Sequence, residues 1–140
     1  IDRFGTRGKG AMVRYCMIVS SIIDSLGICK VPALSISGNY DLKKEARLVR
    51  LLTDLDMDTE ALLRIGERTV NLEKLFNLRF GATNDLDTLP EIFLSEPLET
   101  GASSGAKVDL KPMVEEFYRS MGWDSDGVPL PETLQRLGIA

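Results

Sequence analysis

The sequence contains no histidine and only two cysteines among its 140 residues. Without an imidazole, the chain cannot by itself supply a catalytic triad, a histidine proton relay or a common zinc site. The two cysteines, Cys16 and Cys29, are thirteen positions apart, a spacing that matches neither a metal knuckle nor a redox pair. These absences exclude many of the common metal and acid–base chemistries from this chain alone.

Long apolar runs and an excess of positive charge are also lacking. No segment reaches the roughly 18 uninterrupted apolar residues of a membrane span. The net charge of −4 argues against nucleic acid or an anionic membrane as the main partner, since both attract basic surfaces. We therefore expect a cytoplasmic protein that binds neither nucleic acid nor membrane.

The composition is typical of one globular domain. Hydrophobic residues make up 44% and charged residues 27% of a chain long enough to bury a real core. We expect residues 1–140 to form a single helical domain, in which residues 1–10 are a flexible lead-in. A phosphate-binding loop there is disfavoured, because no apolar strand precedes it and no Ser or Thr follows Lys9. The chain begins at Ile1 rather than at a Met, which suggests a piece of a longer protein.

Apolar residues recur at helical spacing in several segments, and no strand pattern is convincing. The fold class that they predict is all-α, a multi-helix orthogonal bundle with long loops. The predicted helices cover residues 12–26, 42–55, 58–80, 112–121 and 131–137, with a short helical turn at 92–94. Their predicted inward residues are Met12, Tyr15, Cys16, Val19, Ile22, Ile23 and Leu26; Ala46, Val49, Leu52 and Leu55; Leu62, Ile65, Thr69, Leu72, Leu75, Phe76 and Leu78; and Met113, Val114, Phe117, Tyr118 and Met121.

Capping residues and glycines mark where these helices begin and end. Gly66, by contrast, lies inside a predicted helix, where it costs about 1 kcal/mol relative to Ala. We therefore expect a neighbouring segment to approach closely at Gly66, and a polar turn at residues 35–40. The predicted ends are the N-caps Asp41 and Asp58, the N-terminal prolines Pro112 and Pro131, and the closing glycines Gly27, Gly81, Gly122 and Gly138.

Asp24 has an unfavourable place in the last turn of the most apolar predicted helix. The helix macrodipole concentrates negative charge there and disfavours a carboxylate by about 0.3–1 kcal/mol. Such a carboxylate needs a hydrogen-bond donor from outside the helix. Cys29 follows just beyond the helix end with Lys30 beside it, on a segment that we expect to be extended.

Two interpretations of this region remain open on the residues alone. In the simpler one, Asp24 bonds a neighbouring backbone N–H or an arginine, and Cys29 is a small buried hydrophobe. In the other, both side chains face a ligand. Cys16 lies on the apolar stripe and is expected in the core in either case.

Four motifs occur in order along the chain and together point to a family. They are residues 24–29, residues 66–81, residues 87–93 with 96–98, and residues 118–127 followed by Leu134, Leu137 and Gly138. In this order and at these separations, they resemble the C-terminal domain of the tungsten-containing aldehyde ferredoxin oxidoreductases. The resemblance extends from about Gly10 to the end of the chain.

The resemblance implies a role for three residues. The family pattern at the first motif is Asp-x-x-Gly-Leu followed by Cys or Asp, and here Ile28 stands in place of Leu. Asp24 would accept hydrogen bonds from N–H groups of one pterin of a tungsten bis-pterin (tungstopterin, a molybdopterin-type cofactor). Ile28 would offer backbone contacts. Cys29 would be one of four thiolate ligands of a [4Fe–4S] iron–sulfur cluster, and no catalytic residue is expected in this chain.

The resemblance also implies partners. The other three cluster ligands, the second pterin motif and the acid–base residues would lie in N-terminal domains of the same polypeptide, so the isolated chain should be inactive. The full enzyme would oxidise an aldehyde to a carboxylic acid and pass the electrons to ferredoxin, with a homodimer left open. The alternative is a helical structural or interaction module that has lost the cofactor, while a helix-turn-helix nucleic-acid binder is disfavoured by the acidic charge.

Overall fold

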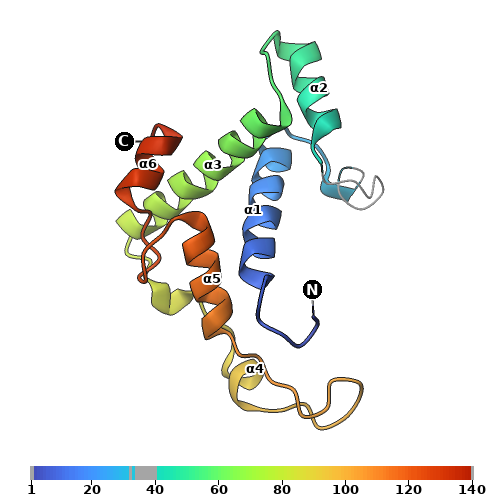
Figure 1. Cartoon of the computed structure of the whole chain (residues 1–140), viewed down its shortest axis with the longest axis vertical. Helices are drawn as coiled ribbons and strands as arrows, with labels where there is room; N and C mark the ends of the chain where they lie inside the picture. The colour runs from blue at the N-terminus through green and yellow to red at the C-terminus, as the bar shows by residue number, and fades with distance from the viewer. Residues whose placement is uncertain (1, 32, 34–40, 140) are drawn as a thin grey trace. The chain divides into compact units, whose positions relative to one another are not determined.

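The computed structural model describes residues 2–31, 33 and 41–139, and this part of the chain is helical (Figure 1). Within it, the one strand-like feature is an isolated bridge between Trp123 and Pro129. The predicted all-α class is confirmed. No helix among the described residues is both long and apolar enough to cross a membrane. The elements are α1 (Lys9–Ser25), α2 (Lys43–Thr53), α3 (Thr59–Arg79), the 3-10 helix η2 (Asn84–Leu86), α4 (Glu91–Ser95), α5 (Lys111–Met121) and α6 (Pro131–Leu137).

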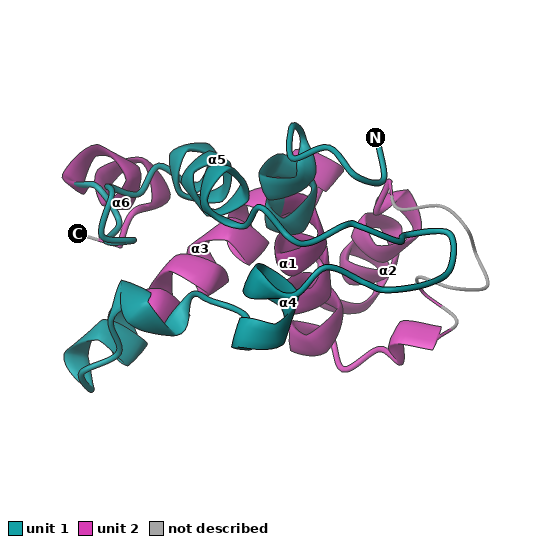
Figure 2. Cartoon of the chain, turned by 90° about the horizontal axis from the view of Figure 1, so that it is seen from below, with its two compact units in different colours: residues 1–14, 75–130 teal, residues 15–74, 131–140 magenta. Residues whose placement is uncertain are grey.

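The chain divides into two compact units, which Figure 2 colours separately. Unit 1 comprises residues 1–14 and 75–130, and unit 2 comprises residues 15–74 and 131–140. Both α1 and α3 contribute one part to each unit. The expected single domain with a flexible lead-in stays a prediction.

In unit 2, α1 and α3 meet closely at Gly66. A Cβ atom on Gly66 would lie 2.7 Å from Ile22 Cγ1 and 2.8 Å from the Ile18 carbonyl oxygen. The Ser21 hydroxyl lies at the same contact, 2.9 Å from the Ile18 carbonyl oxygen and 3.2 Å from that of Gly66. The close approach expected at Gly66 is confirmed. The buried apolar residues of these helices and α6 include Ile18, Val19, Ile22, Ile23, Leu62, Val70 and Leu137.

The second motif, residues 66–81, also ties α3 to α6. The buried Glu67 carboxylate accepts two hydrogen bonds from the Arg136 guanidinium, at 2.9 and 3.2 Å. Arg68 donates to the Leu137 carbonyl at 3.1 Å, and the side-chain amide of the fully buried Asn71 donates to the Glu67 carbonyl at 2.8 Å. Charge-assisted pairs of this kind are about twice as strong as neutral ones. The first half of this motif therefore serves the fold of unit 2.

In unit 1, a carboxylate from α5 caps the N-terminus of α1. Glu116 accepts the Gly8 N–H at 2.9 Å and the Gly10 N–H at 2.8 Å. These backbone hydrogen bonds lower the pKa of Glu116, and the bond from Gly8 has the largest effect. Gly10 is buried against α5, because a Cβ atom there would lie 2.4 Å from the Phe117 nitrogen and 2.6 Å from the Met113 carbonyl oxygen.

An aromatic cluster closes the C-terminal end of α5. Trp123 packs back on this helix, with its ring centroid 5.4 Å from that of Phe117 and 5.9 Å from that of Tyr118. Beyond it, Asp124 Oδ1 accepts the N–H groups of Asp126 and Val128, each at 2.9 Å. The closing glycines are also confirmed, since Gly27, Gly81, Gly122 and Gly138 all have positive φ.

The start of α2 differs from the prediction by one residue. Leu42, in left-handed conformation with φ 57°, occupies the N-cap position, and Asp41 accepts the Lys43 N–H from one residue further back. The N-cap predicted at Asp58 is confirmed, because its Oδ1 accepts the Ala61 N–H at 2.7 Å. The polar turn predicted at residues 35–40 lies outside the described residues.

Several apolar residues predicted to face the core are exposed in the described chain. In α2, Ala46 and Val49 are buried as predicted, but Leu52 is 74% exposed. Cys16, expected in the core, is exposed as well. Periodicity identifies an apolar face but not the chain that covers it, and no described segment covers these residues. The other mispredicted core residues with large exposure are Met12, Tyr15, Leu55, Ile65, Leu72 and Phe76.

Candidate functional site

The C-terminal end of α1 adopts the two-bond glycine cap that its sequence predicts. Gly27 is left-handed with φ 66°, and its N–H donates to the Asp24 carbonyl at 3.1 Å. The Ile28 N–H reaches back to the Ile23 carbonyl at 3.1 Å. This pair of bonds is the Schellman arrangement, which satisfies carbonyls that would otherwise lack donors. It holds Asp24 in the last turn of the helix, as expected.

The carboxylate of Asp24 finds its external donor in Lys30. The Lys30 Nζ lies 2.8 Å from Asp24 Oδ2, and the two side chains are 47% and 62% exposed. The partner is therefore neither the backbone N–H nor the arginine of the simpler interpretation. An ion pair this exposed contributes only about 0–1 kcal/mol, so it leaves Asp24 available to a stronger donor.

Cys29 presents a free, exposed thiol beyond this helix end. Lys30 and Val31, which follow, are helical rather than extended as predicted, and the Ala33 N–H donates to the Cys29 carbonyl at 3.4 Å, while Pro32 lies outside the described residues. A buried hydrophobic role for Cys29 is therefore wrong for the described chain. Ile28, between the helix end and the thiol, has its N–H engaged with Ile23, so its carbonyl is the backbone group that it can offer.

The donor set at this helix end fits one part of a metal–cofactor site. Among the described residues, no group of three or more His, Cys, Asp or Glu side chains could hold a metal ion. A [4Fe–4S] cluster needs four ligands, and Cys29 can supply one exposed thiolate. Asp24 is a half-exposed carboxylate that can accept charge-assisted hydrogen bonds. These residues can therefore contribute to such a site but cannot complete it.

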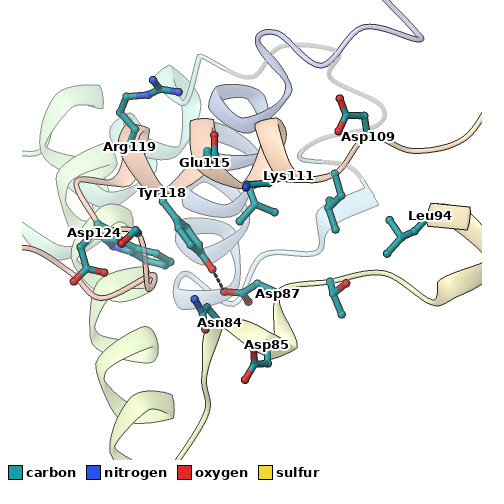
Figure 3. A pocket seen from close by; sticks show the side chains of 15 residues that line it. Asn84, Asp85, Asp87, Leu94, Asp109, Lys111, Glu115, Tyr118, Arg119 and Asp124 are labelled. Atoms are coloured by element: carbon teal, nitrogen blue, oxygen red, sulfur yellow. Dashed lines mark hydrogen bonds between the residues drawn. The ribbon is translucent and has the colours of Figure 1, made fainter.

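The third and fourth motifs meet at a separate cavity of about 1000 Å³ in unit 1 (Figure 3). Tyr118 is buried and its hydroxyl donates to Asp87 Oδ2, which Figure 3 marks with a dashed line. Burial, followed by this hydrogen bond, raises the pKa of Tyr118 above its ordinary value of 10.0. The Tyr118–Asp87 bond holds the loop before α4 on α5, so it gives one residue of each motif a structural role.

Sequence reasoning missed the partners that lie far along the chain. Glu116 lies 106 residues from Gly10, and no local pattern connects the two. Tyr118 and Asp87 were each part of a motif, but nothing in either motif predicted their bond. Lys30 was identified beside the thiol, yet nothing in its position predicted the ion pair with Asp24, six residues back.

The described chain is thus all-α, and the end of α1 exposes one carboxylate, Asp24, and one thiol, Cys29. The family model described as "Aldehyde ferredoxin oxidoreductase, domains 2 & 3" matches residues 1–139. The chain belongs to this family of oxidoreductases.

Individual relatives agree with the family model. The chain is 39% identical over 123 residues to the tungsten-containing aldehyde ferredoxin oxidoreductase of Pyrococcus furiosus, covering 87% of this chain. It is 37% identical over 123 residues to the protein of the same name from Thermococcus kodakarensis. In both comparisons the match covers 20% of the relative. The chain thus spans about one fifth of the length of the curated relatives that it matches.

A weaker relative and a solved structure complete the comparison. The chain is 32% identical over 84 residues to a Pyrococcus furiosus protein named "Aliphatic sulfonate oxidoreductase, WOR-like subunit". Part of one chain in the active-site complex BamBC of benzoyl coenzyme A reductase, solved with 1,5-dienoyl-CoA, has the same fold at a TM-score of 0.70 and 22% identity. This match covers 93% of the present chain and 19% of that chain.

Proposed function

We propose that this chain is the C-terminal part of a tungstopterin, iron–sulfur oxidoreductase that oxidises aldehydes to carboxylic acids with ferredoxin as electron acceptor. The observation that carries the proposal is the end of α1, where Asp24 and Cys29 both lie exposed in a chain of this family. The names of the tungsten-containing relatives support the metal and the reaction.

Each of the three residues has a distinct part in binding. Asp24 accepts N–H groups of one pterin, which replace or share the exposed contact with Lys30. Ile28 contributes through its carbonyl, because its N–H is bonded to Ile23. Cys29 is one thiolate ligand of a [4Fe–4S] cluster, whose other ligands come from N-terminal domains of the same polypeptide.

The bound cofactors supply two-electron oxidation at tungsten and one-electron transfer at the cluster. This chain contributes binding and orientation rather than acid–base chemistry, since it has no histidine, and the carboxylate and thiol at the end of α1, Asp24 and Cys29, are assigned to the cofactors. The isolated chain is therefore inactive, and the ferredoxin contact belongs to the complete protein.

The test is the metal content of the protein made from its complete reading frame, compared with its Cys29→Ser variant. We expect about four irons and one tungsten per polypeptide in the parent protein, and a clear loss of iron in the variant, because serine is a poor ligand for such a cluster. Cys16→Ser is the matched control, since Cys16 is also free and exposed. Unchanged iron in Cys29→Ser would refute the ligand assignment.

The same measurement distinguishes the proposed function from the alternative one. A helical structural or interaction module that has lost the cofactor would contain neither iron nor tungsten in the complete protein. Assaying molybdenum beside tungsten identifies the metal. Because one relative is named for aliphatic sulfonates, the substrate panel should include sulfonates beside aldehydes, with reduction of ferredoxin as the readout.

A further inference from the structure

Beside Asp24, unit 2 contains a hollow of about 430 Å³ between α1 and α3. Its volume falls within the roughly 300–1,000 Å³ of small-molecule sites. Met17 and Val70 form the apolar part of the wall of this hollow, and the other residues that line it are polar. The polar residues are Ser20, Ser21, Asp24 and Ser25 of α1 and Thr69 and Glu73 of α3.

The hydroxyl groups of this hollow are oriented as acceptors. Ser25 donates its hydroxyl proton to the Ser21 carbonyl at 2.7 Å, and Thr69 donates to the Ile65 carbonyl at 3.0 Å. Ser21 is engaged in the same way with the carbonyls at the Gly66 contact. A hydroxyl that has donated its one proton presents only lone pairs. These three oxygens therefore offer acceptors to the hollow.

Two carboxylates add to this set of acceptors. Asp24 holds only the exposed contact with Lys30. Glu73 lies on α3 one turn beyond Thr69, and no hydrogen bond or ion pair engages its side chain within the part of the chain that the structure describes. An ionised carboxylate is acceptor-only. The hollow thus matches a ligand that brings several N–H donors.

We infer that this hollow receives the N–H edge of the same pterin that Asp24 binds, with Glu73 as a second carboxylate acceptor on the opposite helix. The inference rests on the proposed function and extends the binding site from the end of α1 to α3. The amino group and ring N–H of a pterin point along one edge, so carboxylates on two sides of the hollow can each accept from it. Met17 and Val70 then contact the flat ring.

The experiment measures pterin loss from the complete, cofactor-loaded protein. Pterin retained per polypeptide is followed by fluorescence after oxidative release, during dialysis of the parent protein and of Glu73→Gln, Asp24→Asn and Glu60→Gln. Glu60→Gln is the matched control, because Glu60 lies on the same helix, is 84% exposed and is paired with Arg64. We expect Glu73→Gln to speed pterin loss about tenfold, since a hydrogen bond to a charged group is lost.

The thermal midpoint of cofactor-free protein, made in a host that cannot synthesise the pterin, is the second readout. We expect Glu73→Gln to leave this midpoint unchanged, because the residue is exposed and unpartnered in the described chain. A lowered midpoint with unchanged pterin loss would overturn the inference, and would mean that a basic side chain from elsewhere in the polypeptide fills the hollow.

The Asp24→Asn variant separates the two proposals. If Asp24→Asn speeds pterin loss and Glu73→Gln does not, the extension to α3 is wrong while the proposed function stands. If neither variant changes pterin loss, the assignments of both Asp24 and Glu73 are wrong, although a pterin-containing parent protein still supports the proposed oxidoreductase. If the parent protein contains no pterin, both proposals are wrong.

Discussion

Each end of α1 has a carboxylate close by. The helix macrodipole favours the negative charge at the N-terminus and disfavours it at the C-terminus. At the N-terminus, Glu116 accepts two backbone N–H groups, where the macrodipole favours negative charge. At the C-terminus, Asp24 lies where the macrodipole disfavours it, and its one observed partner is the exposed Lys30. Glu116 therefore stabilises the N-terminus of α1 through two hydrogen bonds, whereas the Asp24 carboxylate makes no hydrogen bond to the helix end among the described residues.

We propose that this difference separates a structural carboxylate, Glu116, from a ligand-binding one, Asp24. Glu116 has its hydrogen bonds satisfied within unit 1, so its removal should weaken the fold. Asp24 lies where the helix macrodipole disfavours a carboxylate, and in the proposed function the N–H donors of a pterin offset this cost. Three variants, ordered from the largest expected loss of stability to the smallest, test this comparison.

Gly10→Ala should destabilise the complete protein most. A Cβ atom at this position would lie 2.4 Å from the Phe117 nitrogen, and backbone atoms cannot rotate away as a side chain can. Overpacking of this kind costs about 3 kcal/mol, which thermal unfolding would show as a marked drop of the midpoint. Gly8→Ala is the control, because it has φ 82° and no atom within 4 Å, and should cost only about 1–2 kcal/mol. Equal losses in both variants would contradict the close packing of α1 on α5.

Glu116→Gln should cost less than Gly10→Ala, and its effect should depend on pH. Hydrogen bonds from Gly8 and Gly10 lower the pKa of Glu116 from its ordinary 4.5, so the carboxylate stabilises the fold fully above that value. The stabilisation is lost as the pH falls through the lowered pKa. Unfolding midpoints of parent and variant should therefore differ at neutral pH and converge well below pH 4.5. Glu115→Gln is the control, because Glu115 is exposed on the same helix and its loss should change the midpoint little at neutral pH. A pH-independent difference in Glu116→Gln would contradict the capping role.

Asp24→Asn should change the stability of cofactor-free protein least, by within about 0.5 kcal/mol. Relief of the unfavourable dipole interaction, about 0.3–1 kcal/mol, offsets the loss of the exposed ion pair with Lys30. Pterin retention should nevertheless fall clearly in the loaded protein. A large drop in the unfolding midpoint without cofactor would instead make Asp24 a structural residue, and the contrast between the two ends of α1 would disappear.

Helix ends were the most predictable part of the fold. Gly27, Gly81, Gly122 and Gly138 close helices as predicted, because a left-handed residue is a local requirement that glycine meets at little cost. The position of Asp24 in the last turn followed from the same logic. Gly66 could also be interpreted correctly, since a glycine inside a helix signals a close neighbour.

Burial was less predictable, and so were the partners of polar groups. Leu52 and Cys16 lie on apolar stripes but are exposed, since the described chain has no segment to cover them. The pairs Glu67–Arg136 and Tyr118–Asp87 join residues 69 and 31 positions apart. Such pairs form only after helices have packed, so no local pattern reveals them.

The amino-acid sequence by itself determined the helical class, most helix ends and the family motifs, because these depend on neighbours within a few positions and on motif order. The tertiary structure alone decided which apolar faces are covered, which carboxylate caps α1, and that Glu73 shares a hollow with Asp24. The physical reason is distance along the chain. Backbone conformation responds to adjacent residues, whereas burial and charge pairing depend on side chains that packing brings together from remote positions.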